Sequence, residues 1–193
     1  GGHCSLRLTK RDQLKSLVPN IPGNDHLFWK GRRDLSAYAG IYYPIHGHEL
    51  MKIQIAINDD VHCQTNHGKR IFFGDSVQLI LLLPEQSGIW DIGAAVLDSG
   101  KAECYIWGAP GGFLTEKVAS KIRVSSSRDK RNTLFLNVLL PLKELGTSAK
   151  KLEEKGFRFN VMVNDNDGTC RESWMSLAKH PKDPDEFPVI SFE

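Results

Sequence analysis

The sequence predicts an all-β fold, an antiparallel two-sheet β-sandwich of jelly-roll-like architecture with at most one short helix. Three observations support this prediction. Hydrophobic and polar residues alternate with a period of two in several segments. These segments are short and are separated by turns rich in Gly, Pro, Asn and Asp. A helical pattern is found in one place only, and short strands without alternating helices are typical of sandwiches.

The clearest strand is "ELMKIQIAIND", which begins at Glu49. Its hydrophobic face carries Met51, Ile53, Ile55 and Ile57, and its other face carries Lys52, Gln54, Ala56 and Asn58. Such a pattern predicts a half-buried strand of an antiparallel sheet. The segments "DSVQLILLL" and "TLFLNVLLP" also alternate, with apolar faces formed by Val77, Leu79, Leu81 and Leu83 and by Leu134, Leu136, Val138 and Leu140.

Further strands are expected at residues 38–43, 90–97, 102–107, 121–125, 173–177 and 189–192. The only helical segment is "SAKKLEEK", residues 148–155, which Gly156 closes. We find no linker, internal repeat or low-complexity segment, so a single domain is expected over residues 1–193. Gly1 to His3 resemble a cloning remnant.

The composition is that of an ordinary globular protein, with 40% hydrophobic residues, 25% charged residues and a formal net charge of +2 over 193 residues. No basic stripe is visible, which argues against nucleic acid as a partner. The longest apolar run, Val77 to Leu83, is far shorter than the roughly 20 residues of a membrane-spanning helix, so no membrane insertion is expected. The four cysteines form no CxxC pair.

The segment "FRFNVMVNDNDG", Phe157 to Gly168, has two different faces. One face is apolar, whereas the other carries Arg158, Asn160, Met162 and Asn164. A polar second face either contacts water or contacts a group that needs hydrogen bonds. We interpret it as the floor beside a binding site.

Several segments resemble, in order and spacing, family 9 carbohydrate-binding modules and the wider DOMON-type group of carbohydrate-binding β-sandwiches. These are "FWKGRRDLSA", "INDDVHCQ", "FGDSVQLIL", "CYIWGAP" and "FRFNVMVNDNDGTCRESWMSLAKHPKDPDEFPV". The resemblance covers roughly Phe28 to Val189. It implies a domain that binds sugars without cleaving them, usually as an accessory of a larger glycan-degrading protein such as a xylanase. It also implies a secreted, periplasmic or cell-surface location, although the start of the sequence shows no signal-peptide pattern.

The resemblance also implies a site in which two aromatic side chains hold a terminal sugar. The corresponding positions are Phe72 or Phe73, Gln78, Asn164 and Trp174. A pyranose has an apolar C–H face and a rim of hydroxyls, so it requires aromatic rings and a few fixed donors and acceptors. The predicted ligand-binding residues are Phe72, Gln78, Trp107, Arg158, Asn164, Arg171 and Trp174.

Two acidic turns, "NDD" at 58–60 and "NDNDG" at 164–168, are rich in the oxygen ligands that calcium prefers. By spacing alone, Asp and Asn could simply form these turns. The family resemblance, in which calcium often stabilises the fold, favours a structural calcium ion. Its predicted ligands are Asp59, Asp60, Asp165 and Asp167.

No catalytic motif is present, neither GxSxG, nor HExxH, nor a phosphate-binding loop, so we expect no enzyme activity. Two alternatives remain open. Distant relatives of this sandwich bind haem for electron transfer, which would require an axial ligand such as Met51, Met162 or Met175. The domain could also have lost its ligand site and serve as a spacer or docking module.

Overall fold

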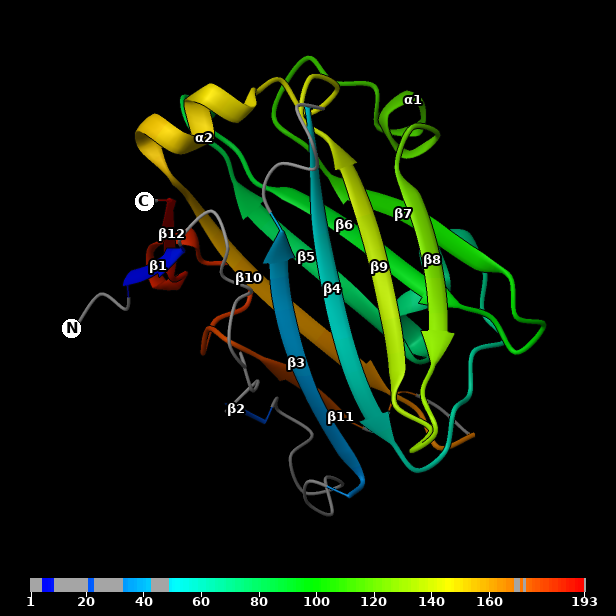
Figure 1. Cartoon of the computed structure of the whole chain (residues 1–193). Coiled ribbons are helices and arrows are strands. Elements are labelled where there is room, and N and C mark those ends of the chain that lie inside the picture. Colours follow the sequence, from blue (N-terminus) through cyan, green and yellow to red (C-terminus); the bar gives the residue numbers. More distant parts are fainter. Residues whose placement is uncertain are drawn as a thin grey trace.

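The structure is a computed structural model that describes residues 5–8, 21–22, 33–42, 49–168, 171 and 173–192. Its strands form two sheets that pack face to face (Figure 1). The larger sheet has eight strands and the smaller has four. The predicted fold class, a β-sandwich, is therefore confirmed.

The four-stranded sheet has the strand order β3-β4-β9-β8, and all of its neighbouring strands are antiparallel. Its strands are β3 (Leu35–Tyr42), β4 (Leu50–Asp59), β9 (Leu134–Pro141) and β8 (Arg123–Arg128).

The main path of the eight-stranded sheet has the order β1-β12-β10-β5-β6-β7; β11 pairs with β10 beside this path, and β2 pairs with β11. The β1–β12 pair is parallel, an exception to the antiparallel pattern. The strands are β1 (Ser5–Leu8), β2 (Ile21–Pro22), β5 (Ser76–Leu82), β6 (Trp90–Val96), β7 (Ala102–Gly108), β10 (Phe157–Asp165), β11 (Ser173–Ser176) and β12 (Val189–Phe192).

The main core lies between the two sheets. Buried and partly exposed residues alternate along β4 and β9, as the period-two pattern predicts. The inward residues Ile53 and Ile55 of β4 are fully buried with Leu79 of β5 and Phe159 of β10. Burial of this apolar surface is the main contribution to the stability of the sandwich.

The predicted helix is α2 (Ala149–Lys155). Ser148 caps it by accepting a hydrogen bond from the backbone N–H of Lys151, and Gly156 ends it with a φ of 66°. A second helix, α1 (Thr115–Ala119), is present, so the expectation of at most one helix was wrong. With five residues it is too short to show a helical period. Two 3₁₀ turns are η1 (Gly68–Phe73) and η2 (Pro184–Glu186).

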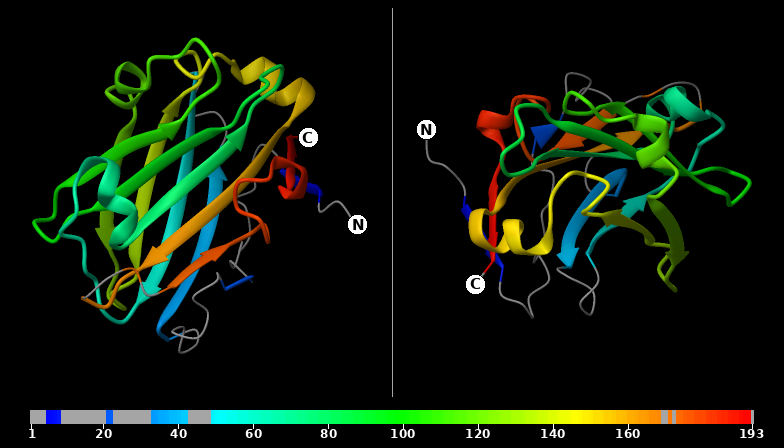
Figure 2. Two further views of the ribbon diagram at one scale, coloured as in Figure 1. Left: turned by 180° about the vertical axis from the view of Figure 1, so that it is seen from behind. Right: turned by 90° about the horizontal axis from the view of Figure 1, so that it is seen from above.

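Both α-helices lie at one end of the sandwich, and the two sheets form separate layers when viewed from above (Figures 1 and 2). Neither helix covers the outer face of the four-stranded sheet. No helix in the described part of the chain is long and apolar enough to cross a membrane.

The polar face of β10 is buried rather than open to water. Asn160 is 0% exposed. Its amide nitrogen donates to the hydroxyl of Ser176 (3.0 Å) and the carbonyl of Pro181 (2.8 Å). Its Oδ1 accepts from the backbone N–H groups of Leu177 and Ala178, both at 3.1 Å. Asn160 thus holds the segment after β11 against the outer face of the eight-stranded sheet.

We expect Asn160→Ala to lower the free energy of unfolding by about 3 kcal/mol, because each buried polar group left without a partner costs about 1–3 kcal/mol. Urea denaturation measures the change. Asn137→Ala, on the partly exposed face of β9, is the matched control and should cost about 1 kcal/mol or less. Equal losses in both variants would contradict the structural role of Asn160.

Candidate functional site

Four aromatic rings gather on the outer face of the eight-stranded sheet. Phe72 and Phe73 come from η1, and Tyr105 and Trp107 come from β7. The ring centroids of Phe72 and Trp107 are 6.0 Å apart, and those of Tyr105 and Trp107 are 5.5 Å apart. Phe73 is 42% exposed, and the other three rings are partly exposed. We call these four residues the aromatic cluster.

The position of Trp107 depends on a glycine in the neighbouring strand. A Cβ atom at Gly93 of β6 would overlap two ring carbons of Trp107, so the indole lies directly on the backbone of β6. The indole N–H donates to the carbonyl of Lys69 at 3.0 Å, which ties the ring to η1. Ile71, which is fully buried, anchors η1 to the same surface.

A line of hydrogen-bonded polar side chains crosses the same face. Asn164 donates to Gln78 Oε1 (3.3 Å), and Gln78 donates to Asp91 Oδ1 (3.1 Å). The three are 1%, 5% and 4% exposed, respectively. A cation lies at each end: Arg171 donates to Asn164 Oδ1 (3.4 Å), and Lys182 Nζ lies 2.7 Å from Asp91 Oδ2. We call these five residues the polar line.

Arg171 connects the polar line to the aromatic cluster. The central carbon of its guanidinium lies 5.9 Å from the ring centroid of Phe72, a cation–π geometry. The same guanidinium is hydrogen-bonded to Asn164. A planar donor group is thus held beside partly exposed rings, an arrangement that can bind a ligand with both an apolar face and hydroxyls.

The structure brings five of the seven predicted ligand-binding residues together: Phe72, Gln78, Trp107, Asn164 and Arg171. Trp174 is different, because it is only 8% exposed. It packs with Ile80, Met162, Ala178 and Phe187 in a small apolar cluster. Although a polar loop precedes Trp174 in the sequence, the chain that follows β11 covers it. Little of its ring is therefore open for stacking.

Arg158 also lies apart from the others. Its guanidinium donates to the carbonyls of Pro184 (3.1 Å) and Asp185 (3.3 Å), so it fixes η2. It lies near the other end of β10 from Asn164, about 20 Å away along an extended strand. Arg158 is therefore separated from the other predicted site residues. Trp174 lies beside them, as the cross-strand partner of Asn164 in the β10–β11 pair, but its side chain is largely buried.

Sequence reasoning missed Asp91, Lys182 and Tyr105. The signal for Asp91 was present, since an acidic residue interrupts the otherwise apolar strand "WDIGAAV". No comparable signal pointed to Lys182, because it reaches Asp91 only through the folding of residues distant in the sequence.

A group of acidic residues lies where β4 and β10 end. One carboxylate oxygen from each of Asp59, Asp165 and Asp167 lies within 4.8 Å of the others, and the same holds for Asp34, Asp60 and Asp167. The four predicted calcium ligands, which come from two turns far apart in the sequence, are therefore neighbours, and Asp34 joins them. We call these five residues the carboxylate cluster.

The electrostatics of the carboxylate cluster favour a cation. Burial, followed by the charges of Asp75 and Asp165, raises the pKa of Asp59 to about 9. The ionised form of Asp59 is therefore unfavourable unless a positive charge compensates for it. The oxygen ligands and their charge suit calcium, which prefers several carboxylates and carbonyls.

Asp75 joins the loops on either side of the carboxylate cluster. Its carboxylate accepts from the backbone N–H of Asn166 (2.8 Å) and from that of Cys63. His62 Nδ1 lies 3.2 Å from the same carboxylate, and this hydrogen bond raises the pKa of His62. Neither Asp75 nor His62 was predicted from the sequence.

A cavity of about 890 Å³ lies among β7, β8 and α1. It is large enough for a haem, but its described lining contains no Met, His or Lys. Cys104 lines it, and burial raises the pKa of that thiol to about 12, so it remains protonated. Met51, Met162 and Met175 are all buried in apolar clusters. No observation in the described residues favours the haem alternative.

No model of a protein family matches the sequence, and no curated protein does either. Solved structures do match. A family 9 carbohydrate-binding module from Caldicellulosiruptor kristjanssonii in complex with cellotriose has a TM-score of 0.66 and 11% identity, covering 98% of this chain and 93% of that one. The fold is that of a family 9 carbohydrate-binding module.

Two further solved structures share the fold of this chain. The Caldicellulosiruptor kristjanssonii module in complex with glucose has a TM-score of 0.65 and 11% identity, covering 97% of this chain and 96% of that one. A protein from Bacteroides uniformis ATCC 8492, provisionally described as carbohydrate-binding, has a TM-score of 0.63 and 13% identity, with 100% of both chains covered. At these identities the comparison establishes the fold and leaves the ligand open.

We expect Gly93→Ala to move Trp107 and to lower the free energy of unfolding by about 1–3 kcal/mol, because the added methyl group overlaps the indole. Tryptophan fluorescence should change together with the melting temperature. Gly108→Ala is the matched control in β7, since the nearest atom to its new Cβ would be 3.6 Å away. If both variants behave like wild type, the indole does not lie on Gly93.

Proposed function

We propose that this domain is a non-catalytic carbohydrate-binding module that binds a glycan or terminal sugar at the aromatic cluster. One observation carries the proposal: a guanidinium, that of Arg171, is held by buried hydrogen-bonding groups next to partly exposed aromatic rings. This pairing matches the apolar face and hydroxyl rim of a pyranose. Support also comes from the fold, which is shared with modules whose structures contain cellotriose or glucose.

In the proposed binding mode, the C–H face of a sugar packs on the rings of Phe72 and Phe73. The guanidinium of Arg171 donates to sugar hydroxyls. Asn164 and Gln78 are already hydrogen-bonded to each other and are nearly fully buried, so they position Arg171 rather than contact the sugar. Phe72 and Phe73 lie on the anchored 3₁₀ turn η1, and Gln78 and Asn164 lie on strands, so the site is preorganised.

We expect no hydrolysis of the bound sugar. The carboxylate of Asp91, the acidic group of the polar line, is buried and bound by both Gln78 and Lys182. Glycoside hydrolases generally require two available carboxyl groups on either side of the scissile bond. The proposed role is therefore that of an accessory domain of a secreted or surface protein that acts on glycans.

Binding can be tested by calorimetric titration with glucose and cello-oligosaccharides. Arg171→Ala should weaken binding at least about tenfold, because a charged hydrogen bond contributes about 1.5–3 kcal/mol and 1.4 kcal/mol corresponds to a factor of ten. The double variant Phe72→Ala/Phe73→Ala should lower the affinity by at least a factor of ten, since it removes the stacking surface.

The matched controls lie on other parts of the surface. Arg131→Ala removes an exposed arginine, and Leu114→Ala removes a side chain that is 73% exposed. Both should bind like wild type. If wild type binds none of these sugars or other glycans in an array, the domain is instead a spacer or docking module. If the aromatic variants bind normally, the sugar site lies elsewhere.

We further propose that the carboxylate cluster holds a structural calcium ion. Asp59 ends β4 of the four-stranded sheet and Asp60 follows it, whereas Asp165 ends β10 of the other sheet and Asp167 lies just beyond. A divalent cation there would offset the burial and the charge repulsion that together raise the pKa of Asp59. It would also join the two sheets next to Asn164.

Removal of calcium with a chelator should lower the melting temperature by about 5–10 °C. A ligand at 100 times its Kd stabilises the native state by about 2.7 kcal/mol, and a domain of this size shifts about 2–4 °C per kcal/mol. Asp59→Asn should abolish this response, whereas Asp129→Asn, in an exposed turn, should retain it. A wild-type melting curve that is identical with calcium and with chelator would contradict the proposal.

A further inference from the structure

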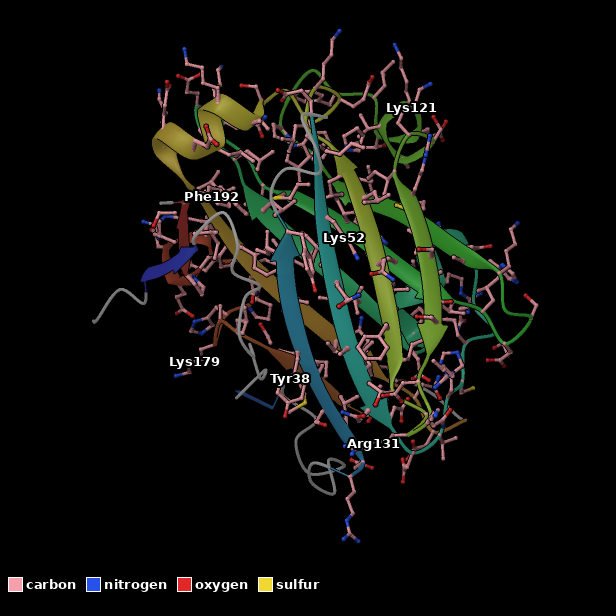
Figure 3. The ribbon with its side chains drawn as sticks, viewed as in Figure 1. Tyr38, Lys52, Lys121, Arg131, Lys179 and Phe192 are labelled. Atoms are coloured by element: carbon pink, nitrogen blue, oxygen red, sulfur yellow. The ribbon has the colours of Figure 1, made fainter. Side chains whose placement is uncertain are left out.

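The outer face of the four-stranded sheet carries side chains in regular rows. The first row contains Tyr42 of β3, Lys52 of β4, Leu139 of β9 and Arg123 of β8, in register across all four strands. Because neighbouring strands are about 4.8 Å apart, this row extends over about 14 Å. Figure 3 shows Lys52 on this face and Lys121 at the end of the sheet where β8 begins.

Polar side chains of this face are already connected to each other. The hydroxyl of Tyr42 donates to Gln54 Oε1 (3.2 Å), and the amide nitrogen of Gln54 donates to Asn137 Oδ1 (2.8 Å). The ring of Tyr42 extends over Gly40, where a Cβ atom would lie 3.3 Å from Tyr42 Cε2. One aromatic ring and two amides are therefore fixed across three strands.

The charge on this face is positive. Lys52 and Arg123 both belong to the first row, and in the described part of the chain neither lies within ion-pair distance of a carboxylate. None of the outward positions on the four strands is Asp or Glu; they are Ser36, Tyr38, Gly40, Tyr42, Leu50, Lys52, Gln54, Ala56, Asn58, Arg123, Ser125, Ser127, Phe135, Asn137, Leu139 and Pro141. Lys52 Nζ lies 4.8 Å from the ring centroid of Tyr42, a cation–π contact that holds the ammonium group on this face. Neither cation is neutralised by a carboxylate of the described residues, so an anionic ligand can pair with both.

A shallow cavity of about 210 Å³ continues the first row at the end of the sheet. Its lining combines an apolar floor with two cations and one carboxylate: Leu50, Leu139, Pro141, Lys121, Arg123 and Glu144. The cavity adds Lys121 to the positive groups that an elongated ligand could reach.

We propose that this face is a second binding surface, specific for an acidic glycan that carries uronate carboxylates. Arg123, Lys52 and Lys121 pair with the carboxylates, since a guanidinium and ammonium groups are suited to such anions. Gln54 and Asn137, which are paired in the row next to the first, bind hydroxyl groups along one side of the same ligand. An acidic peptide would also pair with the cations, so polyglutamate is the comparison ligand in the experiments that follow. This surface belongs to the other sheet from the aromatic cluster, so the proposal does not depend on the function proposed above.

The test is calorimetric titration of the full chain with oligogalacturonate at low salt. Wild type should bind, and the affinity should fall as salt is added, because exposed charges are screened. The double variant Lys52→Ala/Arg123→Ala should lose at least tenfold in affinity. The charge-matched variant Lys101→Ala/Lys150→Ala, on other parts of the surface, should lose less than twofold. Equal losses in the two double variants, or no binding by wild type, would overturn the proposal.

Two further measurements distinguish this surface from the aromatic cluster and from a surface that recognises charge alone. Lys52→Ala/Arg123→Ala should leave binding of neutral cello-oligosaccharides unchanged, and a parallel loss of both ligands would overturn the assignment of a separate site.

Gln54→Ala should weaken binding of oligogalacturonate about threefold or more. If polyglutamate binds as tightly as oligogalacturonate and both are insensitive to Gln54→Ala, the glycan assignment is overturned. All variants should melt within a few degrees of wild type, as expected for substitutions on a partly exposed face.

Discussion

Strand β10 is buried on both faces along most of its length, and this double burial determines the outer surface of the eight-stranded sheet. Its inward side chains Phe159, Val161 and Val163 pack into the core between the sheets. Its outward amides cannot reach water, so they must pair with other groups. Asn160 does so by binding the segment after β11, and Asn164 by joining Gln78 and Arg171. The polar face therefore acts as an internal scaffold.

The candidate sugar site follows from this scaffold. The polar line fixes Arg171, which contacts the ring of Phe72 in turn, while Gly93 provides the flat backbone on which Trp107 lies. The carboxylate cluster begins one residue after Asn164, at Asp165. A cation in that cluster would stabilise the end of β10 from which the site is built. The proposed sugar site and the proposed calcium site thus share residues of one strand, β10.

The matched solved structures share this fold at 11–13% identity. A period-two pattern of apolar residues can be formed by many combinations of Ile, Leu, Val and Phe. The sandwich fold is therefore retained between chains in which few residues are identical. The surfaces are under no such constraint. The row of cations and amides on the four-stranded sheet is therefore a property of this chain that fold similarity neither requires nor excludes.

The sequence by itself determined most of the strands, although it did not predict β1 or β2. It also determined the inward residues of β4, β5, β9 and β10, the capped helix α2, and the oxygen-rich turns. These features depend on the spacing of neighbouring residues, which the chain carries locally. Only the tertiary structure decided that Trp174 is buried, because residues that follow it in the sequence cover its ring. It also decided that Arg158 donates to backbone carbonyls of η2. It also brought Lys182 to Asp91 and placed Asp34 beside Asp60 and Asp167. Such contacts form between side chains of segments that are distant in the sequence. The local spacing of residues does not indicate which of these segments will pack together.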